Sequence, residues 1–170
     1  MIPRFDKLLV LDIDETLIYA SMFPLKRASD FQIGLSAAYK RPGLARFMKT
    51  CLDWFKVGIW TSATPEYTGD VLFHLVNDPA LLAFIWTREH CTSEEDPASG
   101  DHYWGKDLGR LIGQGYRAES IMIVDDSIEV WGRYSAHVVS VAKYRGDPTD
   151  DELEKLIPYL EQLGDIRNAL

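Results

Sequence analysis

The chain has 170 residues and a formal net charge of −8 at pH 7, with 46% hydrophobic and 26% charged residues. These values are typical of one soluble globular domain that can bury its own core. The acidic balance argues against a broad basic surface for nucleic acid or anionic membranes, so we expect no partner of either kind.

Cysteine usage and the N-terminal residues both indicate a protein that is not secreted. The two cysteines, Cys51 and Cys91, are too few for a disulfide framework, and reduced thiols are expected. Residues 1–9 contain no long apolar stretch ahead of a cleavage site, and no window reaches the roughly 18 apolar residues that cross a bilayer. We expect a cytoplasmic location, or a nuclear one in a eukaryotic cell.

The first predicted elements alternate between strand and helix. The apolar run at 7–13 predicts a buried strand, and the stretch 18–40 that follows is predicted to be irregular. A proline and a glycine then open a helix predicted over 43–54, in which apolar side chains recur on one face. Residues 56–60 predict a second strand, and 65–77 predict a second helix with proline in its first turn.

The alternation continues to the end of the chain. The further predicted strands are 83–87, 120–124 and 137–142, and the further helices are 106–114 and 150–164. Residues 92–104 are predicted to be a loop by composition. This order predicts a mostly parallel sheet with helices on both faces. We expect a single domain over 1–170, with its core at about 7–163 and a small insertion at about 88–105.

Polar and acidic residues stand where three of the predicted strands end. They are Asp12 and Asp14, Thr61 and Ser62, and Asp125 and Asp126. Ligands of parallel α/β sheets bind beyond the carboxyl ends of the strands, so we expect these side chains to gather at one site.

The residue types at these strand ends suit phosphoryl chemistry. Clustered carboxylates raise one another's pKa unless a cation relieves the repulsion, and an all-oxygen ligand set favours Mg²⁺. Lys106 and the hydroxyl of Thr61 would provide the cationic and hydrogen-bonding partners that phosphoryl oxygens need. An aspartate can attack phosphorus to form an acyl phosphate, and a second carboxyl can protonate the leaving oxygen and later activate water.

The order of these segments resembles that of the haloacid dehalogenase (HAD) phosphohydrolases, and most of all their FCP/SCP branch, the NIF-domain phosphatases of phosphoserine and phosphothreonine. Six segments carry the resemblance: LDIDETLI, YKRPGLARFM, IWTSATPEYTGDVL, FIWTREHC, KDLGRL and IVDDS. The resemblance implies an α/β fold, the HAD-like Rossmannoid three-layer sandwich with a mostly parallel central sheet. The spacings between Asp14, Thr61 and Lys106 leave no room for a large cap domain.

The resemblance also implies the catalytic and metal-binding residues. Asp12 would be the nucleophile and a Mg²⁺ ligand, and Asp14 would be the general acid/base and bind the metal through its main-chain carbonyl. Asp126 would be the third protein ligand, with Asp125 beside it as a further candidate. Some family members have asparagine at the position of Asp126, so the acid adds negative charge to this site.

For phosphate binding, the resemblance implies Thr61, with Ser62 next to it, and Lys106, while Thr16 would support the catalytic loop. The stretch between Thr61 and Lys106 helps to choose the substrate in this family. Here it is rich in acidic residues, which argues against the RNA polymerase tail peptide as the substrate.

We therefore expect a Mg²⁺-dependent phosphomonoester hydrolase that forms an aspartyl-phosphate and acts on a phosphorylated protein or peptide, which a site without a large lid can admit. One alternative is a phosphatase for a small phosphometabolite or nucleotide, and another is a non-catalytic HAD-like binding module. A receiver domain of two-component signalling is disfavoured, because here the DxD motif comes first and the Asp-Asp pair late.

Overall fold

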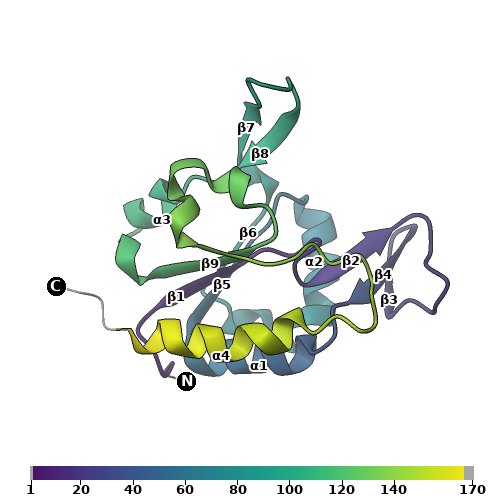
Figure 1. The fold of residues 1–170 in the computed structure, drawn as a ribbon, viewed down its shortest axis with the longest axis horizontal. Coiled ribbons are helices and arrows are strands. Elements are labelled where there is room, and N and C mark those ends of the chain that lie inside the picture. Colours follow the sequence, from purple (N-terminus) through teal and green to yellow (C-terminus); the bar gives the residue numbers. More distant parts are fainter. Residues whose placement is uncertain (1, 167–170) are drawn as a thin grey trace.

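The computed structural model describes residues 2–166. Its centre is a five-stranded parallel sheet in the order β10-β9-β1-β5-β6 (Figure 1). The strands are β1 (Leu8–Leu11), β5 (Lys56–Trp60), β6 (Phe84–Trp86), β9 (Ile121–Asp125) and β10 (Val138–Ser140). Leu8 of the central strand is in register with Lys56 on one side and Ile121 on the other. Each of these strands overlaps in sequence with one of the five predicted strands.

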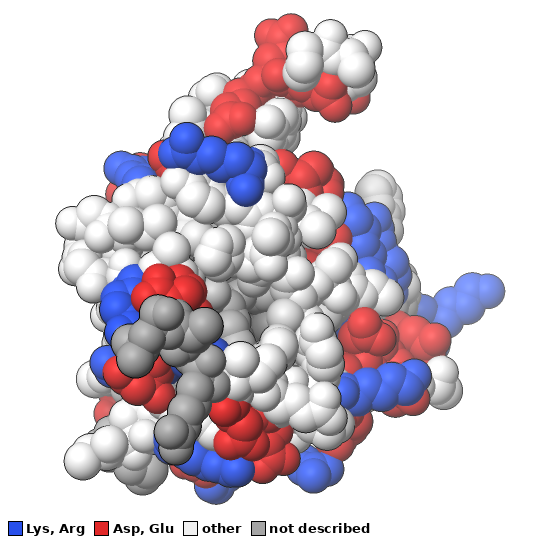
Figure 2. All heavy atoms as spheres, turned by 60° about the vertical axis from the view of Figure 1, so that its left-hand side comes forward, with Lys and Arg blue, Asp and Glu red and all other residues white. Residues whose placement is uncertain are grey.

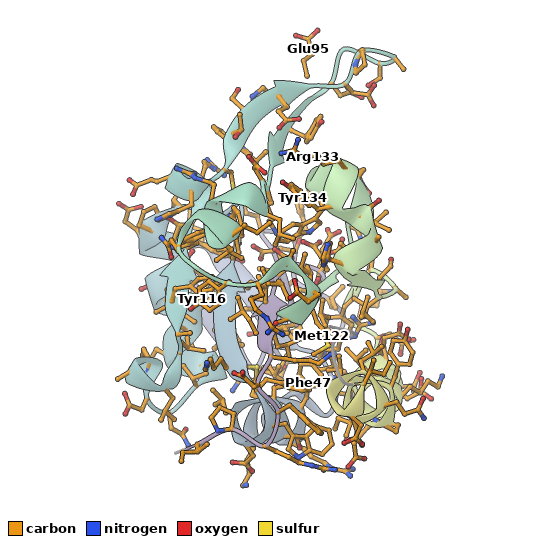
Figure 3. The ribbon with its side chains drawn as sticks, turned by 90° about the vertical axis from the view of Figure 1, so that its left-hand side faces the viewer. Phe47, Glu95, Tyr116, Met122, Arg133 and Tyr134 are labelled. Atoms are coloured by element: carbon orange, nitrogen blue, oxygen red, sulfur yellow. The ribbon has the colours of Figure 1, made fainter. Side chains whose placement is uncertain are left out.

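Helices cover both faces of this sheet. They are α1 (Leu44–Trp54), α2 (Pro65–Leu75), α3 (Gly109–Gly113), α4 (Glu152–Asp165) and the 3-10 segment η4 (Ile128–His137). Leu9 of β1 belongs to a core that includes residues of α1, α2 and α4, whereas Val10 belongs to a second core with residues of α3 and η4. Phe47 of α1 and Met122 of β9, both labelled in Figure 3, lie in the first core. The predicted three-layer α/β architecture is confirmed.

The prediction that residues 18–40 are irregular is wrong. They form an antiparallel sheet in the order β2-β4-β3, with β2 (Ile18–Ser21), β3 (Phe31–Ile33) and β4 (Ser36–Lys40). A two-residue turn joins β3 to β4, and Gly34 in this turn has a φ of 55°, which glycine adopts without steric cost. The strands have three to five residues each, too few for an alternating pattern to stand out.

The prediction of a loop over 92–104 is also wrong. β7 (Thr92–Glu95) and β8 (His102–Gly105) form an antiparallel hairpin that projects from the body of the molecule (Figure 1). All four residues of β7 are exposed, so no buried apolar residue marks that strand in the sequence. Acidic side chains, red in Figure 2, cover much of the hairpin, and Figure 3 shows Glu95 pointing away from the body.

Three short 3-10 segments complete the described structure: η1 (Pro79–Leu81), η2 (Arg88–His90) and η3 (Ala118–Ser120). None of the helices within residues 2–166 combines the length and the apolar composition that crossing a bilayer would require.

Candidate active site

The acidic ends of β1 and β9 lie side by side at one edge of the sheet. The main-chain nitrogen of Asp12 donates a hydrogen bond to the carbonyl of Val124 (3.0 Å), which extends the strand pairing up to the acids. One carboxylate oxygen each from Asp12, Asp125 and Asp126 lie within 4.8 Å of one another. The parallel sheet therefore brings together acids that are far apart in the chain.

A cavity of about 170 Å³ opens beside these carboxylates. Asp14, Ser62 and Trp104 also line it, so residues that follow β1 and β5 face it together with the base of the hairpin. A larger groove of about 440 Å³ runs along β10 and α4, but Glu152 is the one acid among the residues that line it. Chemistry rather than size singles out the acid-lined cavity.

Lys106 is a buried cation that lies between two acids of the cluster. Its Nζ donates hydrogen bonds to Asp12 Oδ1 and Asp125 Oδ2, each at 2.8 Å. Burial lowers the pKa of Lys106, but the two adjacent carboxylates outweigh burial and hold the pKa above its usual range. The lysine is therefore charged, and it offsets two buried acids at once.

Asp125 accepts more hydrogen bonds than Asp12 or Asp126. Its Oδ2 also accepts a hydrogen bond from Trp131 Nε1 (2.9 Å), and its Oδ1 accepts one from the main chain of Ser127 (2.9 Å). Most of its lone pairs are therefore engaged by the protein. Sequence reasoning missed Trp131, because a tryptophan among apolar residues is typical of a core position.

The environment of Asp12 disfavours its charged form in the absence of a metal. Burial is the largest cause of the raised pKa of Asp12, and the charges of Asp125 and Asp14 add to it, while Lys106 opposes them. A carboxylate in this position is more stable when a further cation binds. The threonine predicted to support the loop lies here: Thr16 Oγ1 is 2.8 Å from Asp126 Oδ1 and 3.3 Å from Asp12 Oδ2.

Asp14 lies apart from the three clustered acids and has a different partner. Its Oδ1 accepts a hydrogen bond of 2.5 Å from the phenol of Tyr67 on α2. Burial raises the pKa of Asp14, and the hydrogen bond from Tyr67 acts in the opposite direction. Tyr67 is part of the helix predicted over 65–77, and nothing in the sequence indicates that its hydroxyl reaches this acid.

The two predicted phosphate-binding residues after β5 differ in their position relative to the cavity. Thr61 is buried, and its hydroxyl accepts a hydrogen bond from the main chain of Ala63 (3.1 Å), whereas Ser62 lines the cavity. The side chain of Arg88 donates a hydrogen bond to the carbonyl of Ser62 (2.8 Å) and lies over the ring of Trp104. Segments 61–62 and 88–104 are thus connected at the edge of the cavity.

The loop after β10 supplies two exposed cations that sequence reasoning missed. Lys143 Nζ lies 3.6 Å from Asp126 Oδ2 and 3.9 Å from Glu15 Oε2, and Arg145 lies 3.1 Å from Glu15 Oε1. Glu15 has a φ of 61°, a left-handed conformation that is uncommon for residues other than glycine. The main-chain nitrogen of Tyr144 donates a hydrogen bond to the carbonyl of Glu15 (2.6 Å), which connects the two loops.

The clustered residues suit a hard divalent cation. Carboxylate oxygens from Asp12, Asp125 and Asp126 converge, and no cysteine or histidine takes part in this group. Oxygen-only ligand sets fit Mg²⁺ or Ca²⁺ rather than zinc or copper. Asp125 accepts hydrogen bonds from Lys106, Trp131 and Ser127, whereas Asp12 and Asp126 each accept at most two, so Asp12 and Asp126 are the more available ligands.

Residues 7–169 match the family model described as NLI interacting factor-like phosphatase. Phosphatase PSR1 of Saccharomyces cerevisiae is 28% identical to the chain, with 92% of the chain and 36% of the relative covered. CTD nuclear envelope phosphatase 1B of Danio rerio is also 28% identical, over 96% of the chain and 71% of the relative. An uncharacterized protein of Schizosaccharomyces pombe is 30% identical over 92% of the chain and 47% of its own length. The chain thus spans less than half of two of these three relatives.

Solved structures agree on the fold. The fission yeast RNA polymerase II CTD phosphatase Fcp1, bound to beryllium fluoride, superposes with a TM-score of 0.61 at 18% identity, over 94% of this chain and 51% of that one. A haloacid dehalogenase-like hydrolase from Xanthomonas campestris gives 0.57 at 10% identity, over 95% and 97% of the two chains. At these identities the likeness concerns the fold alone, and it confirms the predicted HAD-like sandwich.

Proposed function

The chain belongs to the NLI interacting factor-like phosphatase family, and on this basis we propose that it is a Mg²⁺-dependent phosphatase of phosphoserine or phosphothreonine in proteins. The observation that carries the proposal is the grouping of Asp12, Asp125 and Asp126, with Lys106 bonded to the first two of them and Asp14 at the same cavity. This grouping separates a nucleophile from an acid/base residue and leaves room for a cation.

In the proposed first step, a carboxylate oxygen of Asp12 attacks phosphorus and the bond to the leaving oxygen breaks. Asp14 gives its proton to that oxygen, so the alcohol of the substrate leaves neutral. The raised pKa of Asp14, caused mainly by burial, supports a protonated acid in this role. Tyr67 occupies Asp14 Oδ1 and leaves the other oxygen free to carry the proton.

In the proposed second step, Asp14 accepts a proton from water, and the water oxygen attacks phosphorus. The bond between phosphorus and Asp12 breaks, which restores the Asp12 carboxylate and releases inorganic phosphate. Lys106 stays beside Asp12 in both steps and offsets the negative charge of the transferring group. Mg²⁺, when bound, supplies further positive charge for the phosphoryl oxygens. Asp12 and Asp126 would hold it, with the main-chain carbonyl of Asp14 as the family resemblance implies.

Two features support a macromolecular substrate. The segments between the catalytic residues form a small antiparallel sheet at 18–40 and a hairpin at 92–105, neither of which is a separately folded lid. Two of the similar proteins, CTD nuclear envelope phosphatase 1B and the RNA polymerase II CTD phosphatase Fcp1, also carry names that contain the words CTD and phosphatase, which supports a protein substrate. An exposed phosphoserine could reach such an open site.

The test measures phosphate release from a panel of phosphoserine and phosphothreonine peptides and a panel of phosphometabolites and nucleotides, in Mg²⁺ or in EDTA. We expect the peptides to be the better substrates and the activity to require Mg²⁺. Asp12→Asn should abolish turnover, whereas Asp6→Asn, at an exposed surface acid, should not. Full activity of Asp12→Asn would refute the nucleophile, preference for metabolites would support the small-molecule alternative, and no turnover of any phosphoester would support the binding module.

A further inference from the structure

The acid cluster has a second cation, at the side that Lys106 does not reach. Lys143 Nζ lies 3.6 Å from Oδ2 of Asp126, and it is the one cationic partner of Asp126 within residues 2–166. The side chain of Asp126 is 4% exposed and that of Lys143 is 48% exposed. An ammonium group thus reaches from solvent to a carboxylate that is otherwise covered.

The two lysines differ in how firmly they are held. Lys106 is buried and donates hydrogen bonds to two acids, so its removal would leave buried charges without a partner. Lys143 lies beyond hydrogen-bond distance from Asp126, and its ammonium group also forms an ion pair with Glu15. Because the Lys143 side chain is about half exposed and makes no hydrogen bond to Asp126, it can swing into solvent at little cost.

We propose that Lys143 is a positioning residue for the metal site: it offsets the charge of Asp126 while the site has no metal, and it lowers the affinity for Mg²⁺ by repulsion. The inference rests on the proposed function, because it requires Asp126 to be a metal ligand. A cation bound to one oxygen of Asp126 and an ammonium near the other are close enough to repel each other. Lys143 therefore sets the Mg²⁺ concentration at which the site fills.

Arg145 offers a matched control. It comes from the same loop and is 62% exposed, but its guanidinium pairs with Glu15 and not with Asp126. Removing Arg145 deletes a nearby positive charge without touching a proposed ligand. Lys143→Arg provides the second control, because it keeps the charge at Asp126.

The experiment is thermal unfolding of the full chain without substrate, from EDTA through a Mg²⁺ titration at constant ionic strength. For Lys143→Met we expect the midpoint in EDTA to fall by about 1–3 °C, because a weak ion pair is lost. We also expect the Mg²⁺ concentration that gives half of the Mg²⁺-induced stabilisation to be roughly three- to tenfold lower in Lys143→Met than in the wild type. Lys143→Arg should retain the wild-type midpoint in EDTA and the wild-type half-saturating Mg²⁺ concentration. Arg145→Met should leave the half-saturating concentration unchanged.

An unchanged or higher half-saturating concentration in Lys143→Met would overturn the inference. An equal decrease in Arg145→Met would overturn it too, since the effect would then be one of general surface charge. If the wild-type chain shows no Mg²⁺-dependent shift, the metal site itself fails and the inference with it. A wild-type shift that Asp126→Asn weakens, together with no change in Lys143→Met, would retain the metal site and reject the role of Lys143.

Discussion

Tyr67 on α2 donates its phenolic hydrogen to Asp14, a residue 53 positions earlier in the chain. Burial and the charge of Asp14 raise the pKa of Tyr67 itself, so the phenol remains a donor. The contact fixes the orientation of the proposed acid/base residue from a helix outside the catalytic loop. It also makes the protonation of Asp14 depend on a side chain that has no chemical role of its own.

The first prediction concerns Tyr67→Phe. Loss of one hydrogen bond to the acid/base residue should lower kcat about tenfold, the equivalent of roughly 1.4 kcal/mol. Because Tyr67 lowers the pKa of Asp14, its removal should raise that pKa further. The proposed first step needs protonated Asp14, so the fall of kcat at alkaline pH should move to higher pH. Phosphopeptide turnover measured against pH tests this, with Tyr159→Phe, exposed on α4, as the control.

The second prediction concerns the buried Lys106. Lys106→Met should abolish activity and lower the free energy of unfolding by about 3 kcal/mol, because Asp12 and Asp125 lose their cation. Adding Asp125→Asn should recover part of that loss, so the two effects should not be additive. Urea unfolding in EDTA measures both. Lys49→Met, which breaks an exposed pair with Asp53, should cost less than about 1 kcal/mol; an equal cost at both lysines would contradict the prediction.

The third prediction tests the packing of the sheet. A Cβ on Gly58 of β5 would lie 2.3 Å from the ring of Phe84 on β6. Gly58→Ala should therefore reduce stability by about 1–3 kcal/mol through overpacking. Gly113→Ala is the matched control, because a Cβ there meets nothing within 4 Å, and it should be neutral or slightly stabilising. Urea unfolding of the two variants distinguishes them, and Phe84→Leu in the Gly58→Ala background should recover stability.

The fourth prediction concerns Arg41, a fully buried cation whose Nε lies 2.8 Å from Asp150 Oδ1. Arg41 also donates hydrogen bonds to the carbonyls of Thr16 and Ala142, so it joins the loop after β1 to the loop after β10. Asp150→Asn should destabilise the protein by about 3 kcal/mol at pH 7, because the guanidinium remains buried without its counter-charge.

The same pair predicts a pH dependence of stability. Burial alone would raise the pKa of Asp150, but the hydrogen bonds and charge of Arg41 outweigh it and lower the pKa. A lowered pKa in the folded state stabilises the protein above the unfolded value of about 3.9, and the stabilisation is lost as the pH falls through the folded value. The stability difference between wild type and Asp150→Asn should therefore be constant near pH 7 and shrink below about pH 4. A stability difference between the wild type and Asp150→Asn that stays constant down to pH 3 would contradict this prediction.

The parts of the fold that the sequence predicts best are those buried on both faces. β1 and β9 consist of consecutive buried residues, and such apolar runs are the strongest strand signal in a parallel sheet. The antiparallel segments were missed for the opposite reason. β7 is exposed along its whole length, and β3 alternates between apolar and polar residues over only three positions, which is too short to indicate a strand.

Some residues of the candidate site can be predicted from the sequence and others cannot. Asp12, Asp125 and Asp126 could be predicted, because a polar group at the end of a buried strand is conspicuous and parallel strands end at one edge. Tyr67, Trp131 and Lys143 could not, since their roles depend on which distant atom each side chain meets. A tyrosine in an amphipathic helix and a lysine in a loop have the same local sequence signals whether or not an acid lies opposite them.

The contact between Thr16 and Asp126 spans 110 positions of the chain and depends on β9 lying beside β1. During synthesis, a nascent polypeptide that ends before β9 already contains both acids of the DxD motif but lacks the partner carboxylates. Parallel pairing over such a separation is a late event in folding, because loop closure must precede it. The proposed cation site would thus form only after β9 has paired with β1, and shorter nascent chains would lack two of its three carboxylates.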